Sequence, residues 1–318
     1  MTSPRRAIGT SDLQVFPLSL GGNVFGWTAD RETSFAVLDA YTAAGGNFVD
    51  TADGYSAWVP GNTGGDSERI LGEWFEARGN RDDVVLATKV SQHPDFKGLA
   101  ADNIRRAADA SLERLKSDRI DLYYAHFDDE TVPLEETVAA LSGLIDAGKV
   151  RTIGISNYSP ERVEEWFAIT EREGLHRPVA LQPHYNLVER SYEEKYRALV
   201  QCENLGVMPY FALAAGFLTG KYRDGVTVES PRAAGAAKYL DETGRRVLAA
   251  LDDVAAAHGV SVATIALAWL AAQPTVTAPI ASARTLEQLP DLLASVAVEL
   301  TADELVALDG ASEAAKAA

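Results

Sequence analysis

Residues 48–55 read Phe48-Val49-Asp50-Thr51-Ala52-Asp53-Gly54-Tyr55, and we expect a buried strand to end within them. The short apolar run that leads to Asp50 has the length of a strand that is buried in a sheet. Asp50 would stand where this strand leaves the core, and an unpaired buried carboxylate is costly. Taken alone, the stretch would also fit a turn capped by Asp50 with the Tyr55 hydroxyl in water. Partners for Asp50 elsewhere in the chain decide between the two interpretations.

Outward from this stretch, apolar runs of strand length alternate with helical patterns along the chain. The expected strands are Pro17–Gly21, Asn47–Thr51, Val84–Val90, Ile120–His126, Val150–Ser156, Ala180–Gln182, Val207–Tyr210 and Val276–Ile280. The expected helices are Arg31–Ala44, Ser67–Arg78, Asp102–Leu115, Leu134–Ala147, Pro160–Glu173, Tyr192–Asn204, and Gly244–His258 joined to Val262–Ala272. This alternation is typical of a parallel sheet whose strands are connected by helices.

Eight strands followed by helices, without a linker or a break in composition, predict a (β/α)8 TIM barrel that forms one domain over residues 1–318. A short N-terminal β-hairpin, from Arg6–Gly9 and Leu13–Phe16, is expected to precede it. The alternative is a doubly wound open sheet, which carries a G-x-G-x-x-G turn after its first strand when it binds a dinucleotide. The glycines of Gly21–Gly26 do not have that spacing, and the segment runs into Trp27 instead of a helix. The sequence therefore favours the barrel.

Composition excludes several classes of function. The formal net charge of −17 disfavours binding to nucleic acid or to an anionic membrane. No apolar run reaches membrane-spanning length, and no apolar segment of a signal peptide follows the first residues, so we expect a cytoplasmic protein. The single cysteine, Cys202, cannot form a disulfide within the chain, and we expect it to be a small core residue. The five histidines show no close ligand spacing, so no metal site is expected. No stretch resembles an obligate interface, which predicts a monomer.

Polar residues stand at the ends of three consecutive expected strands. Asp50 and Tyr55 follow the second strand, Lys89 ends the third, and His126 ends the fourth. Active sites of barrel enzymes gather at the carboxyl ends of the strands. A single lysine there is usually solvated and a single histidine is usually structural, but four such residues at one end of neighbouring strands indicate a shared site.

These four residues would form a proton-transfer site. A tyrosine hydroxyl has a pKa of about 10, too high for ready proton exchange at neutral pH. Lys89 beside Tyr55 would lower that pKa, and Asp50 would hold Lys89 charged and in position. His126 could hydrogen-bond a substrate oxygen next to Tyr55. Such a site can protonate a carbonyl oxygen, or deprotonate an alcohol, while a hydride moves. The chain has no G-x-S-x-G motif, which argues against a serine hydrolase.

With these residues in view, the chain resembles the aldo-keto reductases, specifically the bacterial NADP-dependent oxidoreductases, over essentially its whole length. The segments that carry the resemblance are Phe48–Tyr55, Ser111–Leu115, Gly154–Tyr158, Gln182–Asn186 and Leu218–Tyr222. The resemblance implies that Asp50, Tyr55, Lys89 and His126 are the catalytic tetrad. It implies NADPH-dependent reduction of an aldehyde or ketone to an alcohol, with Tyr55 as the general acid.

The resemblance also implies that NAD(P)H lies extended across the mouth of the barrel without a Rossmann fold. The implied cofactor-binding residues are Gly22, Asn23, Asp50, Ser156, Asn157, Gln182, Tyr210, Leu213, Gly216, Lys221, Ser282, Arg284 and Gln288. Within this set, Ser156, Asn157 and Gln182 would hold the nicotinamide carboxamide, and Tyr210 would stack on the ring.

The preference for NADPH over NADH rests on positive charge near the phosphates. Arg284 is the candidate for the 2′-phosphate, because a guanidinium matches phosphate oxygens bidentately. The loop Phe211–Tyr222 would cover the pyrophosphate, where Lys221 supplies a cation that this acidic chain needs locally. The chain departs from the family pattern at Ser282, where relatives often carry glycine, and at Leu292, where asparagine is common.

Three aromatic residues just past strand ends, Trp27, Trp58 and Phe127, would wall an apolar pocket for the carbonyl substrate, although ordinary loop packing would also explain them. Two other functions suit the same residues. One is a cofactor-sensing or partner-binding subunit, as in the β subunits of potassium channels. The other is an alcohol or sugar dehydrogenase working in the oxidative direction, because the tetrad serves either direction.

Overall fold

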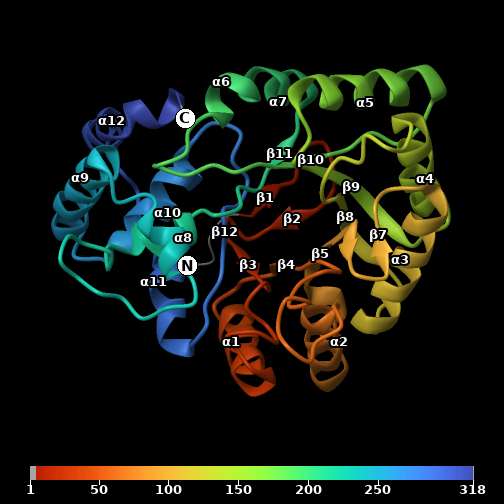
Figure 1. The fold of residues 1–318 in the computed structure, drawn as a ribbon, viewed down its shortest axis with the longest axis horizontal. Coiled ribbons are helices and arrows are strands. Elements are labelled where there is room, and N and C mark those ends of the chain that lie inside the picture. Colours follow the sequence, from red (N-terminus) through yellow and green to blue (C-terminus); the bar gives the residue numbers. More distant parts are fainter. Residues whose placement is uncertain (1–4, 318) are drawn as a thin grey trace.

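The computed structural model describes residues 5–317, so Met1–Pro4 and Ala318, which belong to the predicted domain, lie outside the described residues. Eight parallel strands form the centre of the fold, and helices surround them (Figure 1). The strands are β3 (Ser19–Gly21), β4 (Phe48–Asp50), β5 (Val85–Val90), β8 (Ile120–Ala125), β9 (Val150–Ser156), β10 (Ala180–Gln182), β11 (Gly206–Val207) and β12 (Ile280–Ala281). Their order in the sheet is β11-β10-β9-β8-β5-β4-β3-β12.

The sheet closes on itself between its two ends. Val207 of β11 forms a parallel bridge with Val276. The Val207 amide donates to the Thr275 carbonyl at 3.2 Å, and the Thr277 amide donates to the Val207 carbonyl at 2.8 Å. The predicted (β/α)8 barrel is therefore confirmed. The predicted N-terminal hairpin is also present, with β1 (Arg6–Ala7) paired antiparallel to β2 (Gln14–Val15).

Some of the helices begin at a residue whose side chain caps the first turn. The side chains of Asp30, Ser159 and Ser261 accept hydrogen bonds from the backbone three residues further on, as N-cap residues do. The helices are α1 (Arg31–Ala43), α2 (Asp66–Arg78), α3 (Ala101–Leu115), α4 (Leu134–Asp146), α5 (Pro160–Glu173), α6 (Tyr192–Lys195), α7 (Arg197–Glu203), α8 (Ala233–Ala237), α9 (Glu242–His258), α10 (Val262–Ala272), α11 (Leu289–Ala294) and α12 (Ala302–Ala311).

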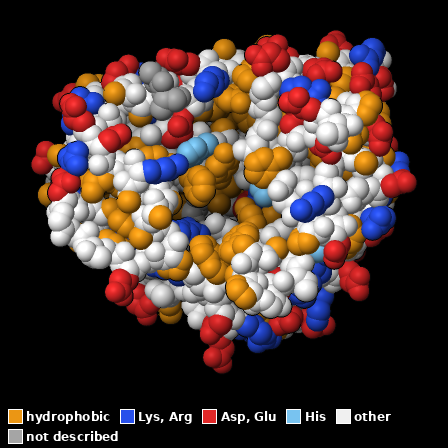
Figure 2. All heavy atoms as spheres, in the orientation of Figure 1, with side chains coloured by type: hydrophobic (Ala, Val, Ile, Leu, Met, Phe, Trp, Pro, Cys, Tyr) orange, Lys and Arg blue, Asp and Glu red, His pale blue; other side chains and the backbone are white. Residues whose placement is uncertain are grey.

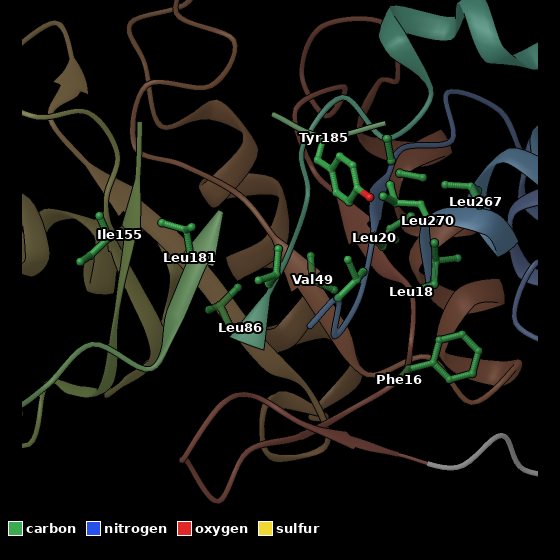
Figure 3. Close-up of a cluster of buried hydrophobic side chains, with 14 of the residues drawn as sticks. Phe16, Leu18, Leu20, Val49, Leu86, Ile155, Leu181, Tyr185, Leu267 and Leu270 are labelled. Carbon is green, nitrogen blue, oxygen red and sulfur yellow. The ribbon is translucent and has the colours of Figure 1, made fainter. Parts of the chain in front are cut away.

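Alternation along the strands divides the core into two parts. One set of strand side chains packs outward against the helices; Figure 3 shows Leu20 and Val49, which belong to this set, and Leu267 and Leu270 of α10 in the same buried cluster. The other set fills the barrel interior, and it includes Phe48, Ala87, Leu122, Tyr124 and Met208. Side chains of the β1–β2 segment belong to this interior cluster, so the hairpin closes the end of the barrel opposite the strand carboxyl ends.

The structure differs from the expected elements at a few places. The helix expected over Tyr192–Asn204 is broken into α6 and α7 at Tyr196, whose backbone leaves the helical region. The eighth strand begins later than expected, because Pro279 has no amide hydrogen to continue the ladder after Val276. A second hairpin, β6 (Gln92–His93) with β7 (Phe96–Lys97), and the helices α8, α11 and α12 were not expected.

The expectation that Cys202 is a core residue is wrong. Cys202 is exposed on α7, whose buried side chain is Val200. Two positions along an α-helix correspond to a rotation of about 200°, so Cys202 lies on the opposite side of the helix from Val200.

Within residues 5–317, no single helix is both long enough and apolar enough to cross a membrane. The pair α9 and α10 reaches the required length and composition together, but the two helices are bent by 98° to one another. Residues Ala263–Leu270 of α10 are all buried against the rest of the barrel, which accounts for the apolar composition of this helix.

Candidate active site

A tight turn after β4 directs Tyr55 back over the barrel. The Tyr55 amide donates to the Ala52 carbonyl at 3.2 Å. Ser56 has a left-handed φ of 67°, and its hydroxyl donates to the Phe25 carbonyl at 2.8 Å. A Cβ atom on Gly54 would lie 2.9 Å from the Gln92 carbonyl oxygen, so this position has no room for a side chain. The glycine lets the turn pack directly against β6.

Lys89 joins the residues at the ends of β4 and β5. Its Nζ donates to Asp50 Oδ1 at 2.6 Å, to the Thr51 carbonyl at 2.7 Å and to the Tyr55 hydroxyl at 3.0 Å. An ammonium has three hydrogens, so all of its donors are used. Lys89 is completely buried, and Asp50 is 2% exposed. The structure therefore brings three of the four predicted catalytic residues into direct contact.

The protonation states of this group suit a proton donor. Burial raises the pKa of Tyr55; Lys89 opposes that shift, and Asp50 adds to it. Burial by itself lowers the pKa of Lys89, but Asp50 and Tyr55 together hold it above its ordinary value. The net direction for Tyr55 is opposite to the expected lowering, because burial outweighs the neighbouring cation. Tyr55 thus keeps its proton at neutral pH, and Lys89 keeps its charge.

His126 faces the same space from the end of β8. Its ring centroid is 6.1 Å from that of Tyr55, and both side chains line the same cavity. Burial, assisted by the charge of Lys89, holds the pKa of His126 well below its usual range. Its Nδ1 is buried and has no hydrogen-bond partner among residues 5–317. The imidazole is therefore neutral, with one nitrogen as donor and the other as acceptor.

A chain of hydrogen bonds links Asp50 to residues predicted to hold the nicotinamide. Gln182 Nε2 donates to Asp50 Oδ2 at 2.9 Å, and the Ser156 hydroxyl donates to the Gln182 carbonyl at 2.9 Å. Asn157 Nδ2 contacts the Ser156 hydroxyl at 3.0 Å, and the Tyr210 hydroxyl donates to Asn157 Oδ1 at 2.8 Å. The side chains from β9, β10 and the segment after β11 are thus fixed relative to the tetrad.

A cavity of about 600 Å³ opens at the carboxyl ends of the strands. Figure 2 shows a hollow near the middle of the molecular face, bordered by hydrophobic side chains. The predicted residues that line the cavity are Asn23, Asp50, Tyr55, Trp58, His126, Phe127, Ser156, Asn157, Gln182, Tyr210, Leu213, Gly216, Lys221, Ser282, Arg284 and Gln288.

Three predicted residues do not line this cavity. Lys89 lies beneath it, in contact with Asp50 and Tyr55. Gly22 turns away, because its amide donates to the Asp50 carbonyl at 2.7 Å and its carbonyl accepts from the Ser67 hydroxyl at 2.8 Å. Trp27 stands behind Trp58, with the ring centroids 5.6 Å apart. These bonds hold Gly22 in the turn after β3, and its contact with a cofactor stays a prediction.

A cluster of cations lies at one end of the cavity, and sequence reasoning found only part of it. Arg232 lines the cavity together with Lys221 and Arg284. Its Nη2 is buried without a hydrogen-bond partner in the described part of the chain, and its guanidinium lies 5.4 Å from the Trp27 ring centroid. Burial, and then Arg284, lower the pKa of Arg232. The argument that selected Lys221, a cation in a loop of an acidic chain, could also have selected Arg232.

The two ends of the cavity fit a dinucleotide. Three mutually repelling cations, one with an unpartnered buried nitrogen, are satisfied by an anion such as a phosphate. The other end presents the amides of Asn157 and Gln182 beside the flat ring of Tyr210. Between them, the Ser282 hydroxyl donates to Asn23 Oδ1 at 2.7 Å, which ties the segment after β12 to the loop after β3.

Aromatic side chains from three different loops surround the mouth. Trp58 is 52% exposed, Phe127 is 41% exposed and Phe211 is 48% exposed, although all three are large and apolar. Phe211 was expected only as the first residue of the loop over the pyrophosphate, not as a wall of the substrate pocket; it has a left-handed φ of 52° and belongs to an irregular segment without a periodic pattern. Exposed apolar groups gathered at a cavity mouth are typical of a binding site for an apolar ligand.

Asp53 is a second buried carboxylate that sequence reasoning did not single out. It is completely buried, and its Oδ2 accepts only a 3.3 Å hydrogen bond from the Ser91 amide. Its Oδ1 has no partner among the described residues. Burial and the nearby Glu68 raise the pKa of Asp53 to about 7, against the opposing effect of Arg114.

No group of three or more His, Cys, Asp or Glu residues within 5–317 is arranged to hold a metal ion.

Comparison with known proteins agrees with this geometry. The model of the "Aldo/keto reductase family" matches residues 17–313. The chain is 35% identical over 314 residues to "Norsolorinic acid reductase stcV" of Emericella nidulans, covering 93% of this chain and 78% of that protein. It is 35% identical over 304 residues to "Uncharacterized oxidoreductase YrpG" of Bacillus subtilis, covering 92% of this chain and 91% of that protein. It is also 35% identical over 295 residues to "Probable voltage-gated potassium channel subunit beta" of Oryza sativa, covering 89% of this chain and 88% of that protein.

Proposed function

The chain belongs to the aldo/keto reductase family, and from this premise we propose that it reduces an aldehyde or ketone to an alcohol with NADPH. Membership of the family supports carbonyl reduction in general. The observation that carries the finer proposal is the contact of the buried Lys89 ammonium with both Asp50 and the Tyr55 hydroxyl. That contact supplies a proton donor next to a cavity suited to a dinucleotide.

In this reaction the bound cofactor supplies the hydride that forms the new C–H bond at the carbonyl carbon. Tyr55 gives its proton to the carbonyl oxygen, and Lys89 Nζ, 3.0 Å from the phenolic oxygen, stabilises the phenolate that remains. Asp50 keeps Lys89 charged and in place. The neutral His126 orients the carbonyl oxygen toward Tyr55. Burial, which raises the pKa of Tyr55, prevents loss of the proton before the substrate binds.

For the cofactor, we propose that Ser156, Asn157 and Gln182 bind the carboxamide and that Tyr210 stacks on the nicotinamide ring. Lys221, Arg232 and Arg284 would bind the phosphates. The three cations support NADPH over NADH, because the 2′-phosphate adds negative charge that only the phosphorylated cofactor carries. The exposed rings of Trp58, Phe127 and Phe211 would receive the apolar part of the substrate.

Titration of the purified protein with NADPH and NADH, followed by quenching of its five tryptophans, tests this proposal. Tight binding of NADPH and weak binding of NADH are expected, followed by turnover of a panel of aldehydes and ketones at 340 nm. Equal affinities would contradict the 2′-phosphate role of the arginines. Binding of neither cofactor would refute the proposed function.

The similarity to a potassium channel β subunit keeps one other role open to experiment, that of a cofactor-sensing or partner-binding subunit. Sustained turnover of small aldehydes would count against a purely sensing role. The third possibility is a dehydrogenase that works in the oxidative direction. Comparing the rate of NADP⁺-dependent oxidation of the product alcohol with the rate of carbonyl reduction tests it. We also propose a monomer, which size-exclusion chromatography with light scattering would test.

A further inference from the structure

His184 packs directly behind the ring that would receive the nicotinamide. Its ring is stacked on Tyr210 with centroids 5.3 Å apart and an interplanar angle of 15°, and it lies edge-on to Phe211 at 5.4 Å. Tyr210 and Phe211 line the cavity, whereas His184 does not. The Tyr210 amide donates to the Pro183 carbonyl at 3.0 Å, which anchors the two segments together. His184 therefore contacts the rings of two residues that line the cavity without lining it itself.

Asn186 determines which form of His184 the fold accepts. Asn186 Oδ1 accepts a hydrogen bond from the Val188 amide at 2.8 Å, and its Nδ2 donates to the Phe211 carbonyl at 2.9 Å. These two bonds fix the orientation of the amide group. The same Nδ2 lies 3.4 Å from His184 Nε2, so Nε2 meets a donor and must act as an acceptor. A protonated His184 would place N–H against N–H, and the neutral imidazole is favoured.

The surroundings of His184 act in the same direction. Burial lowers its pKa; Glu189 opposes this shift, and Lys238 adds to it. Glu189 lies in the following loop, where its carboxylate is engaged by the amide and hydroxyl of Ser191. Lys238 lies just after α8. The hydroxyl of Tyr210 is directed to Asn157, away from the histidine.

We propose that His184 is a positioning residue that acts through Tyr210: it fixes the stacking ring and keeps the face behind that ring uncharged. This inference rests on the proposed function, because it takes Tyr210 as the nicotinamide platform. Oxidised nicotinamide carries a positive charge and reduced nicotinamide does not. Protonation of His184 therefore opposes NADP⁺ and leaves NADPH almost unaffected. The histidine makes the balance between product and substrate cofactor depend on pH.

The test is the ratio of the dissociation constants of NADP⁺ and NADPH between pH 8 and pH 5. In the unaltered protein this ratio should rise roughly three- to tenfold as the pH falls, the scale of like charges separated by one aromatic ring. Protonation of the 2′-phosphate cancels in the ratio because both cofactors carry it. His184→Phe, which keeps a stacked neutral ring, should remove most of this rise; any remainder is expected from Asp53, whose pKa is raised to about 7 and whose charge acts on Tyr55. His176→Gln, which changes an exposed histidine paired with Asp146, should behave like the unaltered protein.

A second measurement needs neither cofactor nor the variant. Ring ¹⁵N spectra of the unliganded protein should show His184 Nε2 as an unprotonated acceptor at pH 7, with a midpoint below 6.5. A protonated Nε2 at pH 7, or a ratio that rises equally in His184→Phe, would overturn the inference while leaving the proposed reductase intact. Failure of both cofactors to bind would instead refute the proposed function, and the inference with it.

Discussion

Replacement of Lys89 by methionine is expected to separate the stability of this protein from its activity. Lys89 is completely buried and donates to both Asp50 and Tyr55. Methionine has a similar length and no charge, so the change removes the cation while the space stays largely filled. Asp50 would then be left buried with Gln182 as its side-chain hydrogen-bond donor. The change thus creates an unpaired buried carboxylate.

The loss of stability follows from that orphaned charge. Removing one partner of a buried ion pair lowers the free energy of unfolding by about 3–5 kcal/mol. Adding Asp50→Asn removes the charge as well, so the double variant should regain roughly half or more of that loss. Urea unfolding followed by tryptophan fluorescence measures both values. A double variant no more stable than Lys89→Met would refute the reasoning about the buried charge.

The loss of activity follows from the 3.0 Å separation between Lys89 Nζ and the Tyr55 hydroxyl. Unit charges at this distance interact by about 5 kcal/mol at an effective dielectric constant of 20, an upper limit of roughly four orders of magnitude in rate. We expect single-turnover reduction by Lys89→Met to slow by roughly 10³-fold or more, and NADPH affinity to change less than about threefold. The affinity is spared because Lys89 does not line the cavity.

The double variant decides whether the two effects have separate causes. It should be as slow as Lys89→Met even though it is more stable, because only the lysine stabilises the phenolate. Lys195→Met, at an exposed position on α6, serves as the control and should change neither quantity. Reduction by Lys89→Met at more than about a tenth of the original rate would refute the role given to this contact.

Three further predictions concern Tyr55, Arg232 and Asp53. Because the pKa of Tyr55 is raised and the protonated phenol is the active form, single-turnover reduction should stay constant from pH 6 to 9 and fall only above its ordinary value of 10; a midpoint below 9 would contradict this. Arg232→Ala should weaken NADPH binding about 10- to 100-fold and NADH binding far less, whereas Arg246→Ala on the exposed face of α9 should change neither. The pKa of Asp53 is raised to about 7 in the folded protein. Its protonation therefore adds to the free energy of unfolding in full below pH 4, and this contribution is lost as the pH rises through 7. Asp53→Asn should therefore increase the free energy of unfolding at pH 8, by up to about 4 kcal/mol, and not at pH 4; lower stability at pH 8 would contradict the assignment.

The tetrad could be predicted because its geometry follows from the regular part of the fold. In parallel strands, residues that end neighbouring strands meet at one edge of the sheet. The register confirms this arrangement: Asp50 of β4 lies opposite Ala87 of β5, and Lys89 of β5 lies opposite Tyr124 of β8. The apolar pattern sets where each strand ends, and the topology then brings Asp50, Lys89 and His126 to the same end.

Quantities that depend on how completely a group is buried could not be derived in the same way. The sequence places a cation next to Tyr55, which alone would lower its pKa, but the net pKa is raised because burial dominates. The same applies to Asp53, whose missing hydrogen-bond partner depends on how β4, β5 and α2 pack. Neighbouring charges can be inferred from strand ends, but desolvation is a property of the assembled core.

The residues missed at the cavity come from the irregular segment between β11 and α9, and the reason is physical. Phe211, Ala214 and Ala215 all have left-handed φ values. Residues other than glycine adopt this backbone conformation only when tertiary contacts hold them in it. One such contact is the 2.9 Å hydrogen bond from Asn186 to the Phe211 carbonyl. No local pattern encodes this path, so the position of the Phe211 ring at the mouth could not be predicted from the sequence, although the argument from charge that selected Lys221 could have selected Arg232. The Asn186 amide that holds the Phe211 carbonyl also presents a donor to His184 Nε2. The same side chain therefore fixes the beginning of the cavity loop and favours the neutral form of the histidine behind Tyr210.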